Sequence, residues 1–134
     1  MRIEITTNLS VIRSILAYDD VPKDYYPDVI NKVWFILKQD SETAGIIMFE
    51  YLNFVLWVPH IFIFKKYRGG NSTKWAEKAV AYMENVLGAK KFLALTPYIA
   101  AKKYAEKVGF KLVTVLTKSI QKNGELLDQY VLEK

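Results

Sequence analysis

The strongest constraint on this chain is a glycine turn between an apolar, strand-like run and an amphipathic helix. The apolar run covers residues 54–66, and the turn with its basic flank reads Lys65-Lys66-Tyr67-Arg68-Gly69-Gly70-Asn71-Ser72-Thr73. Glycines let a backbone approach a ligand, and the first amides of a helix lack intrahelical partners and lie at the positive end of its dipole. This arrangement predicts a phosphate-binding turn, although a glycine pair can also serve only to reverse the chain.

Length and composition indicate one domain, residues 1–134, with 51% hydrophobic residues to build its core. Without cysteine and with a single histidine, no disulfide, thiolate nucleophile or protein-only metal site is expected. The N-terminus has no apolar block like that of a signal peptide, and the run 54–66 is too short for a membrane helix. We expect a soluble, cytoplasmic protein with no membrane partner.

The net charge of +5 is unevenly distributed along the chain. Residues 1–59 carry five Lys/Arg against eight Asp/Glu, whereas residues 60–134 carry fourteen against six. A basic half suits a polyanionic ligand and an acidic half suits a cationic one, although many of these residues simply solvate a surface. A pI near 9.3 also fits a nucleic-acid-binding module, but no nucleic-acid motif is present, so a nucleic-acid partner is not favoured.

The spacing of apolar residues predicts strands and helices in alternation, without repeats or linkers. In the first half it predicts, in order, a strand over 2–6, a helix over 9–18, an irregular loop over 19–26 with a short helix over 27–32 as one option, and strands over 33–38, 44–51 and 54–66. Proline cannot donate to a ladder, so Pro59 predicts a break or bulge in the third of these strands.

In the second half the pattern predicts a helix over 72–87, a strand over 91–95, a helix over 98–107, and strands over 110–119 and 126–132. Gly88 and Gly109 stand where the two helices should end. Asn123-Gly124 predicts a type I′ hairpin turn, because both central positions of that turn need positive φ. The expected fold class is α/β (α+β), one sheet with helices on both faces.

These features resemble the Gcn5-related N-acetyltransferases (GNAT). The resemblance rests on the strand entering Tyr67-Arg68-Gly69-Gly70 and a helix, on the strand over 92–95, and on Ala101 with Lys107-Val108-Gly109-Phe110, which is similar to the end of the family's last helix. The order of the predicted strands and helices, together with the terminal hairpin, also resembles the family, so the resemblance covers nearly the whole chain. It implies a GNAT-like mixed, mostly antiparallel twisted central sheet with helices on both faces and a C-terminal hairpin.

The resemblance also implies acetyl-CoA as cosubstrate and an amine as acceptor, and homodimers are common in the family. In the family a bulge splays two central strands and the cofactor's arm enters between them. In this chain the resemblance would place the splay between the strand that contains His60 and the strand over 91–95. The turn's amides would hold the pyrophosphate. The cofactor-binding residues expected are Ile63, Phe64, Arg68, Gly69, Gly70, Asn71, Ser72, Thr73, Lys74 and Lys103.

The candidates for proton transfer are His60, Glu50, Tyr98 and Tyr104. His60 suits a base because the ordinary pKa of histidine is about 6.5. Glu50 is predicted on a neighbouring strand near the splay. Both have ordinary structural alternatives, His60 as a satisfied strand residue beside a proline and Glu50 as the polar end of a strand.

The glycine turn departs from the family's pattern, which is Gln/Arg-x-x-Gly-x-Gly/Ala. Counted from Arg68, the two small positions hold Asn71 and Thr73. Counted from the preceding residue, they hold Gly70 and Ser72, but the Gln/Arg is lost. A close approach of backbone amides to phosphate therefore rests on the Gly69-Gly70 pair more than on the family's spacing.

The last helix departs from the family as well. Many members carry a tyrosine four residues before the glycine, as general acid for the departing thiolate, and this chain has Ala105 there. Tyr104 is adjacent, but one residue along a helix turns the side chain by about 100°. Tyr98 stands at the start of the helix, where asparagine is frequent in the family.

Three functions therefore stand as hypotheses. The first is an acetyl-CoA-dependent N-acetyltransferase acting on a primary amine, with acidic residues in the loop near the acceptor: Asp19, Asp20, Asp24 and Asp28, beside Tyr25 and Tyr26. The second is a catalytically degenerate GNAT-like scaffold, phage-encoded and virion-associated or protein-binding. The third is a basic nucleic-acid-binding module, whose affinity would fall steeply with salt.

Overall fold

The computed structural model describes residues 1–18 and 27–134. Its strands are β1 (Arg2–Thr6), β2 (Lys32–Gln39), β3 (Glu42–Tyr51), β4 (Leu56–Ile63), β5 (Lys91–Thr96), β6 (Lys111–Lys122) and β7 (Glu125–Glu133). Its helices are α1 (Leu9–Leu16), α2 (Thr73–Asn85) and α3 (Ile99–Val108), with a single 3-10 turn, η1 (Lys65–Tyr67), before α2. Every strand predicted from the sequence is present, and so are the three longer helices, with shifted ends.

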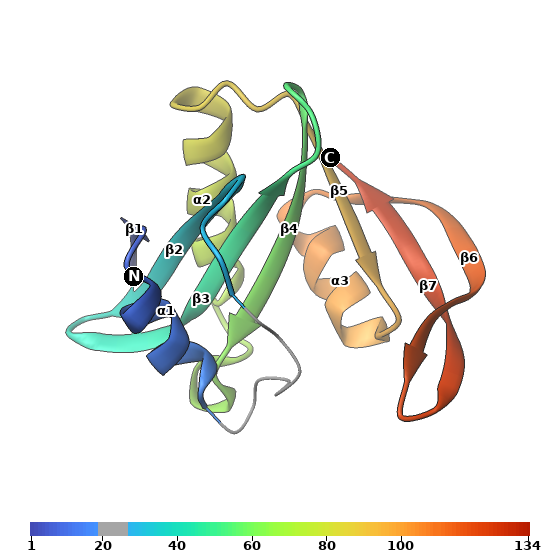
Figure 1. Cartoon of the computed structure of the whole chain (residues 1–134), viewed down its shortest axis with the longest axis horizontal. Coiled ribbons are helices and arrows are strands. Elements are labelled where there is room, and N and C mark those ends of the chain that lie inside the picture. The colour runs from blue at the N-terminus through green and yellow to red at the C-terminus, as the bar shows by residue number, and fades with distance from the viewer. Residues whose placement is uncertain (19–26) are drawn as a thin grey trace.

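The strands form one sheet in the order β1-β2-β3-β4-β5-β7-β6 (Figure 1). Neighbours run antiparallel except β4 and β5, which are parallel. The mixed, mostly antiparallel sheet predicted from the sequence is confirmed. Asn123 and Gly124 both have positive φ, +51° and +80°, in the hairpin turn between β6 and β7, as the type I′ prediction requires.

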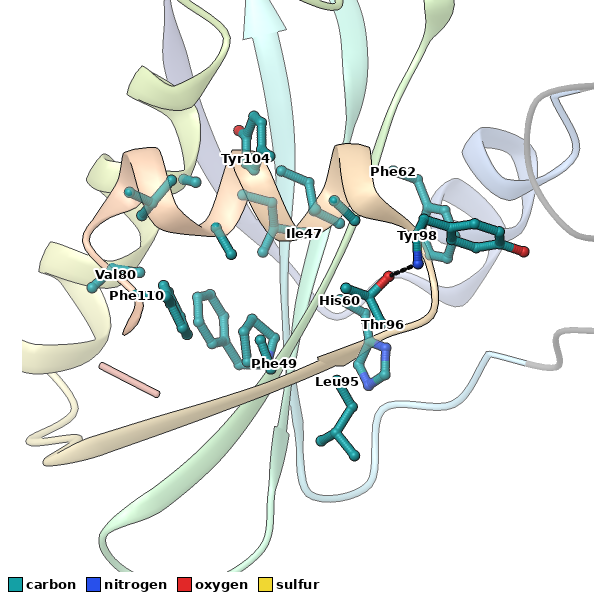
Figure 2. Close-up of a pocket in the computed structure, with 17 residues that line it drawn as sticks. Ile47, Phe49, His60, Phe62, Val80, Leu95, Thr96, Tyr98, Tyr104 and Phe110 are labelled. Atoms are coloured by element: carbon teal, nitrogen blue, oxygen red, sulfur yellow. Dashed lines mark hydrogen bonds between the residues drawn. The ribbon is translucent and has the colours of Figure 1, made fainter. Parts of the chain in front are cut away.

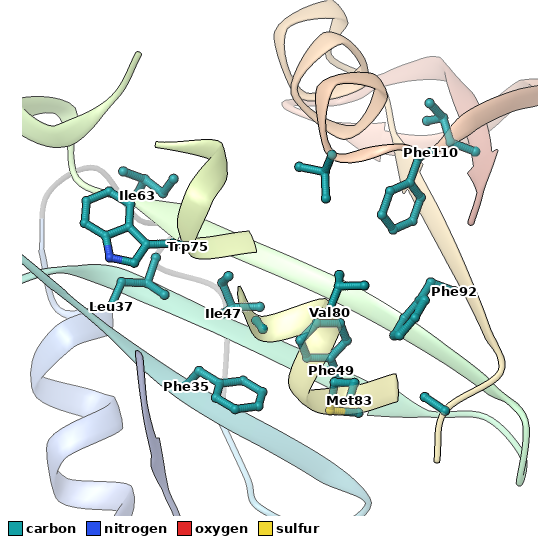
Figure 3. Close-up of a cluster of buried hydrophobic side chains, with 14 of the residues drawn as sticks. Phe35, Leu37, Ile47, Phe49, Ile63, Trp75, Val80, Met83, Phe92 and Phe110 are labelled. Carbon is teal, nitrogen blue, oxygen red and sulfur yellow. The ribbon is translucent and has the colours of Figure 1, made fainter. Parts of the chain in front are cut away.

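Helices cover both faces of the sheet, as predicted. The larger hydrophobic core lies between the sheet and α2, where Trp75 and Met83 pack against Phe35, Phe49 and Phe92 (Figure 3). A smaller core on the opposite face receives α1. Because side chains alternate along a strand, neighbouring residues of β2 and β3 belong to different cores. No helix in the described part of the chain is long and apolar enough to cross a membrane.

Pro59 does not interrupt β4, so the predicted break or bulge is wrong. The register between β3 and β4 is continuous, with Phe49 opposite Pro59. The amide of Phe64 donates to the carbonyl of Ala44, so even-numbered residues of this strand bond to β3 and odd-numbered residues direct their polar groups away from it. The missing N–H of Pro59 therefore removes no hydrogen bond between these two strands.

The short helix considered over 27–32 is also wrong. The carboxylate of Asp28 accepts the amide of Ile30 at 3.0 Å and the Nζ of Lys32 at 2.9 Å. A side-chain acceptor of this kind stabilises a turn in competition with helical bonding. Asn31 follows with φ of +55°, and β2 begins at the next residue.

Candidate active site

A cleft opens where β4 separates from β5. The two strands pair at only two positions, Leu56 with Lys91 and Trp57 with Phe92. The rest of β5 pairs with β7, while β4 continues along β3. The splay predicted beside His60 is confirmed, and it arises because β5 changes partner rather than from a bulge at the proline.

The splay contains a cavity of about 290 Å³, bounded by β3, β4, β5, α2 and α3 (Figure 2). Most of the lining side chains are apolar. Figure 2 shows His60, Thr96 and Tyr98 together at one end, with Val80 and Phe110 at the other. Polar chemistry is therefore available at one end of the cavity.

Two short-range features shape the polar end. The amide of Tyr98 donates to Thr96 Oγ1 at 3.1 Å, which fixes the turn from β5 into α3. Tyr98 lines this end of the cavity and is 54% exposed, and its ring extends away from His60 and Thr96 (Figure 2). Sequence reasoning finds Tyr98 but misses Thr96, although a threonine followed by proline at the end of a strand is a recognisable turn signal.

His60 and Glu50 lie side by side on neighbouring strands. His60 Nε2 is 3.7 Å from Glu50 Oε2, and the two side chains are 42% and 43% exposed. His60 pairs with Met48, whose side chain lies in the core beneath α1, so both groups are on the α1 side of the sheet. Two of the predicted proton-transfer residues are thus brought together at the polar end of the cavity, its mouth, where His60 is part of the lining and Glu50 is its neighbour on β3.

The environment of His60 favours its neutral form. Partial burial lowers the pKa of His60 below 6.5, the Glu50 carboxylate opposes part of that shift, and the ammonium of Lys32 adds to it. Lys32 lies directly opposite Glu50 in the β2–β3 register. A neutral imidazole has a lone pair with which to accept a proton at neutral pH.

The loop between η1 and α2 owes its shape to its two glycines. Gly69 and Gly70 have φ of +82° and +53°, which glycine adopts without strain. A Cβ at either position would meet nothing within 4 Å. These glycines are therefore required by backbone conformation and leave the loop open on its outer side.

Four amides of this loop, those of Gly69, Gly70, Asn71 and Thr73, make no hydrogen bond to the part of the chain that the structure describes. The amide of Ser72 turns back to the carbonyl of Gly69 at 3.0 Å. Unpaired amides grouped at the start of a helix attract an anion through both hydrogen bonding and the helix dipole. The loop therefore has the donors that a phosphate group requires.

Side chains hold this loop at both of its ends. Arg68 Nε donates to the carbonyl of Ile63 at the end of β4, at 2.7 Å. The Tyr104 hydroxyl donates from α3 to the carbonyl of Ser72, at 2.9 Å. Ser72 itself is only 4% exposed. The loop is thus fixed before a ligand arrives, which reduces the ordering cost of binding.

Tyr104, a predicted proton-transfer residue, has its hydroxyl engaged in this contact. Burial raises the pKa of Tyr104 above its ordinary value, and the carboxylate of Glu77 adds to the shift, so the hydroxyl stays protonated and donates. Tyr104→Phe is expected to lower the free energy of unfolding by about 1–2 kcal/mol, since it leaves the Ser72 carbonyl short of a donor. Urea denaturation measures this loss.

The matched control for that prediction is Tyr98→Phe. The Tyr98 hydroxyl has no hydrogen bond to the described residues, so its removal should change stability by no more than about 0.5 kcal/mol. Equal stabilities for the two variants would show that the contact between α3 and the loop does not stabilise the fold.

Some of the predicted cofactor-binding residues lie elsewhere. The Ile63 side chain is in the larger core, and that of Phe64 is in the smaller one, where it stacks on Tyr18 with ring centroids 3.9 Å apart. Lys103 is exposed on α3 and does not line the cavity. Lys74, in contrast, lies directly after the loop, exposed in the first turn of α2, with its ammonium 4.0 Å from Glu77.

Sequence reasoning also misses the apolar wall of the cavity. Ala76 and Val80 of α2 and Ala105 of α3 line it, yet apolar residues at helical spacing predict only a buried face. No group of three or more His, Asp or Glu side chains in residues 1–18 and 27–134 is placed to hold a metal ion.

No family model and no curated protein match this chain. Among solved structures it is similar to a chimera of Vibrio cholerae spermidine N-acetyltransferase SpeG and hSSAT, with a TM-score of 0.79 and 16% identity over 99% of this chain and 95% of that one. It is also similar to a GNAT-family acetyltransferase of Bacillus anthracis, with a TM-score of 0.67 and 19% identity over 78% of this chain and 65% of that one. The chain has the GNAT fold.

A further structure with the GNAT fold is RimL, a ribosomal L7/L12 alpha-N-protein acetyltransferase solved with coenzyme A. It matches with a TM-score of 0.71 and 13% identity, over 78% of this chain and 62% of that one. The resemblance stated from the sequence is confirmed at the level of the fold. At such identities the activity has to be argued from this chain's own residues.

Proposed function

We propose that this protein is an acetyl-CoA-dependent N-acyltransferase that moves an acetyl group to a primary amine. One observation carries the proposal. The loop with four unpaired amides lies at the end of β4, the strand whose separation from β5 opens the cavity. A ligand with a phosphate group joined to a long arm suits this combination, and acetyl-CoA is such a ligand.

The backbone of Arg68 to Lys74 is proposed to bind the pyrophosphate. The odd-numbered residues of β4 direct their amides and carbonyls away from β3. After Trp57, these groups no longer pair with β5 either. Ile61 therefore offers a donor and an acceptor to the amides of the arm. Lys74, in the first turn of the helix that follows the loop, would add positive charge near the phosphates.

His60 is proposed as the base, with Glu50 holding it at 3.7 Å. The imidazole takes a proton from the ammonium form of the acceptor, and the freed amine attacks the thioester carbon. A C–N bond forms, the C–S bond breaks, and the second proton lost by nitrogen passes to sulfur. Tyr98 is proposed to relay that proton, because the Tyr104 hydroxyl is bonded to Ser72.

The acceptor is proposed to be a small polyamine or a protein amine. The name of SpeG gives spermidine as its acceptor, and that of RimL gives a ribosomal protein's α-amine. The residues predicted to attract a cationic amine, apart from Asp28, fall in 19–26, outside the described residues. Asp28 is paired with Lys32 at 2.9 Å. The homodimer and the cytoplasmic location remain predictions that accompany this function.

The pH dependence of kcat/KM should report His60. We expect an acidic limb with an apparent pKa below 6.5, since protonation of the imidazole removes the base. His60→Gln should lower kcat by about 100-fold or more and remove the limb. Glu50→Gln should move the limb to lower pH, because the lost carboxylate no longer raises the pKa of His60.

The assay that tests the function is release of CoA thiol from acetyl-CoA in the presence of an amine panel. The panel contains spermidine, lysine, and a peptide with a free α-amine. Amine-dependent thiol release that falls in His60→Gln supports the proposal. Acetyl-CoA binding without thiol release would favour the catalytically degenerate scaffold, and neither binding nor release would overturn the cofactor assignment.

A further inference from the structure

The two ends of the cavity differ in chemistry, and the apolar end has no role in the mechanism above. It lies at Val80 of α2 and at Phe110 (Figure 2). The lining residues Ala105 and Val108 are toward this end as well, because α3 begins beside Tyr98 at the polar end and runs away from it. Val80, Val108 and Phe110 also belong to the larger core and are each less than a tenth exposed. The cavity therefore extends from the polar mouth into the interior of the protein.

No polar side chain at the apolar end is available to a ligand. Tyr104 lines the cavity, but its hydroxyl is bonded to the Ser72 carbonyl at 2.9 Å. His60, Thr96 and Tyr98 are grouped at the opposite end (Figure 2). Cavities lined by hydrocarbon stay dry and bind apolar molecules. The amides of a CoA arm would lose their hydrogen bonds there, whereas a hydrocarbon chain would lose none.

The position of His60 decides which substrate occupies the apolar end. A base has to reach the proton that it removes, so the amine must lie at the mouth, beside His60 and Glu50. The acyl group of the donor then faces the interior, toward Val80 and Phe110. The apolar end is therefore available to the acyl chain and not to the acceptor.

We propose that the preferred donor is a thioester with a longer hydrocarbon acyl chain than acetyl, of about six carbons. This rests on the proposed function and names the donor class of the same site. An apolar cavity of roughly 150 Å³ accommodates benzene, which has six carbons. The cavity here is about 290 Å³, which leaves comparable space for the thioester and the adjoining part of the arm.

The chemistry is unchanged by chain length. The amine nitrogen bonds to the acyl carbon, the bond from that carbon to sulfur breaks, and CoA leaves as its thiol with the proton that nitrogen loses. No oxidant, reductant or metal is consumed. Only the fit of the hydrocarbon distinguishes acetyl from hexanoyl donors.

The test is calorimetric titration of the whole protein with CoA, acetyl-CoA, butanoyl-CoA and hexanoyl-CoA. Each buried methylene is worth a factor of about four in affinity, so hexanoyl-CoA should bind at least about tenfold more tightly than acetyl-CoA. If CoA and acetyl-CoA bind but hexanoyl-CoA binds no tighter, the chain-length inference is wrong and the proposed function stands. If none of the four binds, both are wrong.

Two variants of α3 locate the effect. Ala105→Phe places a ring in the apolar end and should reduce the hexanoyl advantage to less than about threefold. Ala100→Phe adds the same ring at an exposed position outside the cavity and should keep the full advantage. Ala105→Val is the milder replacement if the phenylalanine variant does not fold. An advantage that survives at position 105 in a folded variant would contradict the assignment.

Discussion

Gly70→Pro is expected to weaken acetyl-CoA binding by about 100-fold or more. Proline holds φ near −65°, whereas Gly70 has φ of +53°, so the loop cannot keep its shape. The substitution also removes one of the four unpaired amides. Hydrogen bonds to charged groups contribute about 1.5–3 kcal/mol each. Losing the Gly70 amide, together with one neighbouring amide that the altered backbone turns away from the ligand, gives a change of this size. Calorimetric titration measures it directly.

Gly70→Ala is the matched control, because alanine keeps the amide. It adds only a Cβ that meets nothing within 4 Å, together with about 1–2 kcal/mol of strain at positive φ. Affinity should therefore fall by much less than in the proline variant. If proline at this position leaves the dissociation constant unchanged, the loop does not bind the phosphates.

Gly45→Ala is expected to lower the free energy of unfolding by at least about 3 kcal/mol. A Cβ at Gly45 would lie 2.1 Å from the carbonyl oxygen of Phe62 and 2.9 Å from the Cα of Ile63. Both atoms belong to the backbone of β4, so the strand itself must shift. The displaced end of β4 carries the carbonyl that Arg68 contacts, and the loop would move with it. Chemical denaturation followed by fluorescence gives the loss.

Gly88→Ala separates steric overlap from backbone strain. Gly88 has φ of +73°, but a Cβ there would enter open space. Alanine should cost about 1–2 kcal/mol through conformation alone. A Gly45→Ala loss no greater than the Gly88→Ala loss would mean that β3 and β4 are not in such close contact at this point.

Sequence patterns predict most of the elements because each is encoded locally. Asn123-Gly124 determines its turn, and Gly109 ends α3 with φ of +107°. The two wrong predictions are the break at Pro59 and the short helix over 27–32, where the Asp28 side chain stabilises a turn. Pro59 is tolerated in β4 because β5 no longer pairs with β4 at that position. The change of partner by β5 cannot be predicted from any local sequence pattern.

The candidate site likewise contains some residues that can be recognised from the sequence and others that cannot. The Arg68-to-Thr73 loop can be recognised from its glycines, and His60 and Glu50 from their chemistry on neighbouring strands. The role of Tyr104 is invisible in the sequence, because its partner Ser72 is 32 positions away and in contact only through the packing of two helices. The cavity is hidden for a related reason, since the residues that line it also form the core.

Titration of the pure protein with acetyl-CoA tests the central claim most directly, with melting temperature as a second readout and ATP as control. ATP has phosphates and adenine but no arm to enter the cleft between β4 and β5. Acetyl-CoA should bind at one site, and at one hundred times its dissociation constant it should add about 2.7 kcal/mol to stability. Its binding should exceed that of ATP by at least about tenfold. The absence of heat and of any thermal shift at millimolar acetyl-CoA would contradict the account and favour a GNAT-fold scaffold that uses no cofactor.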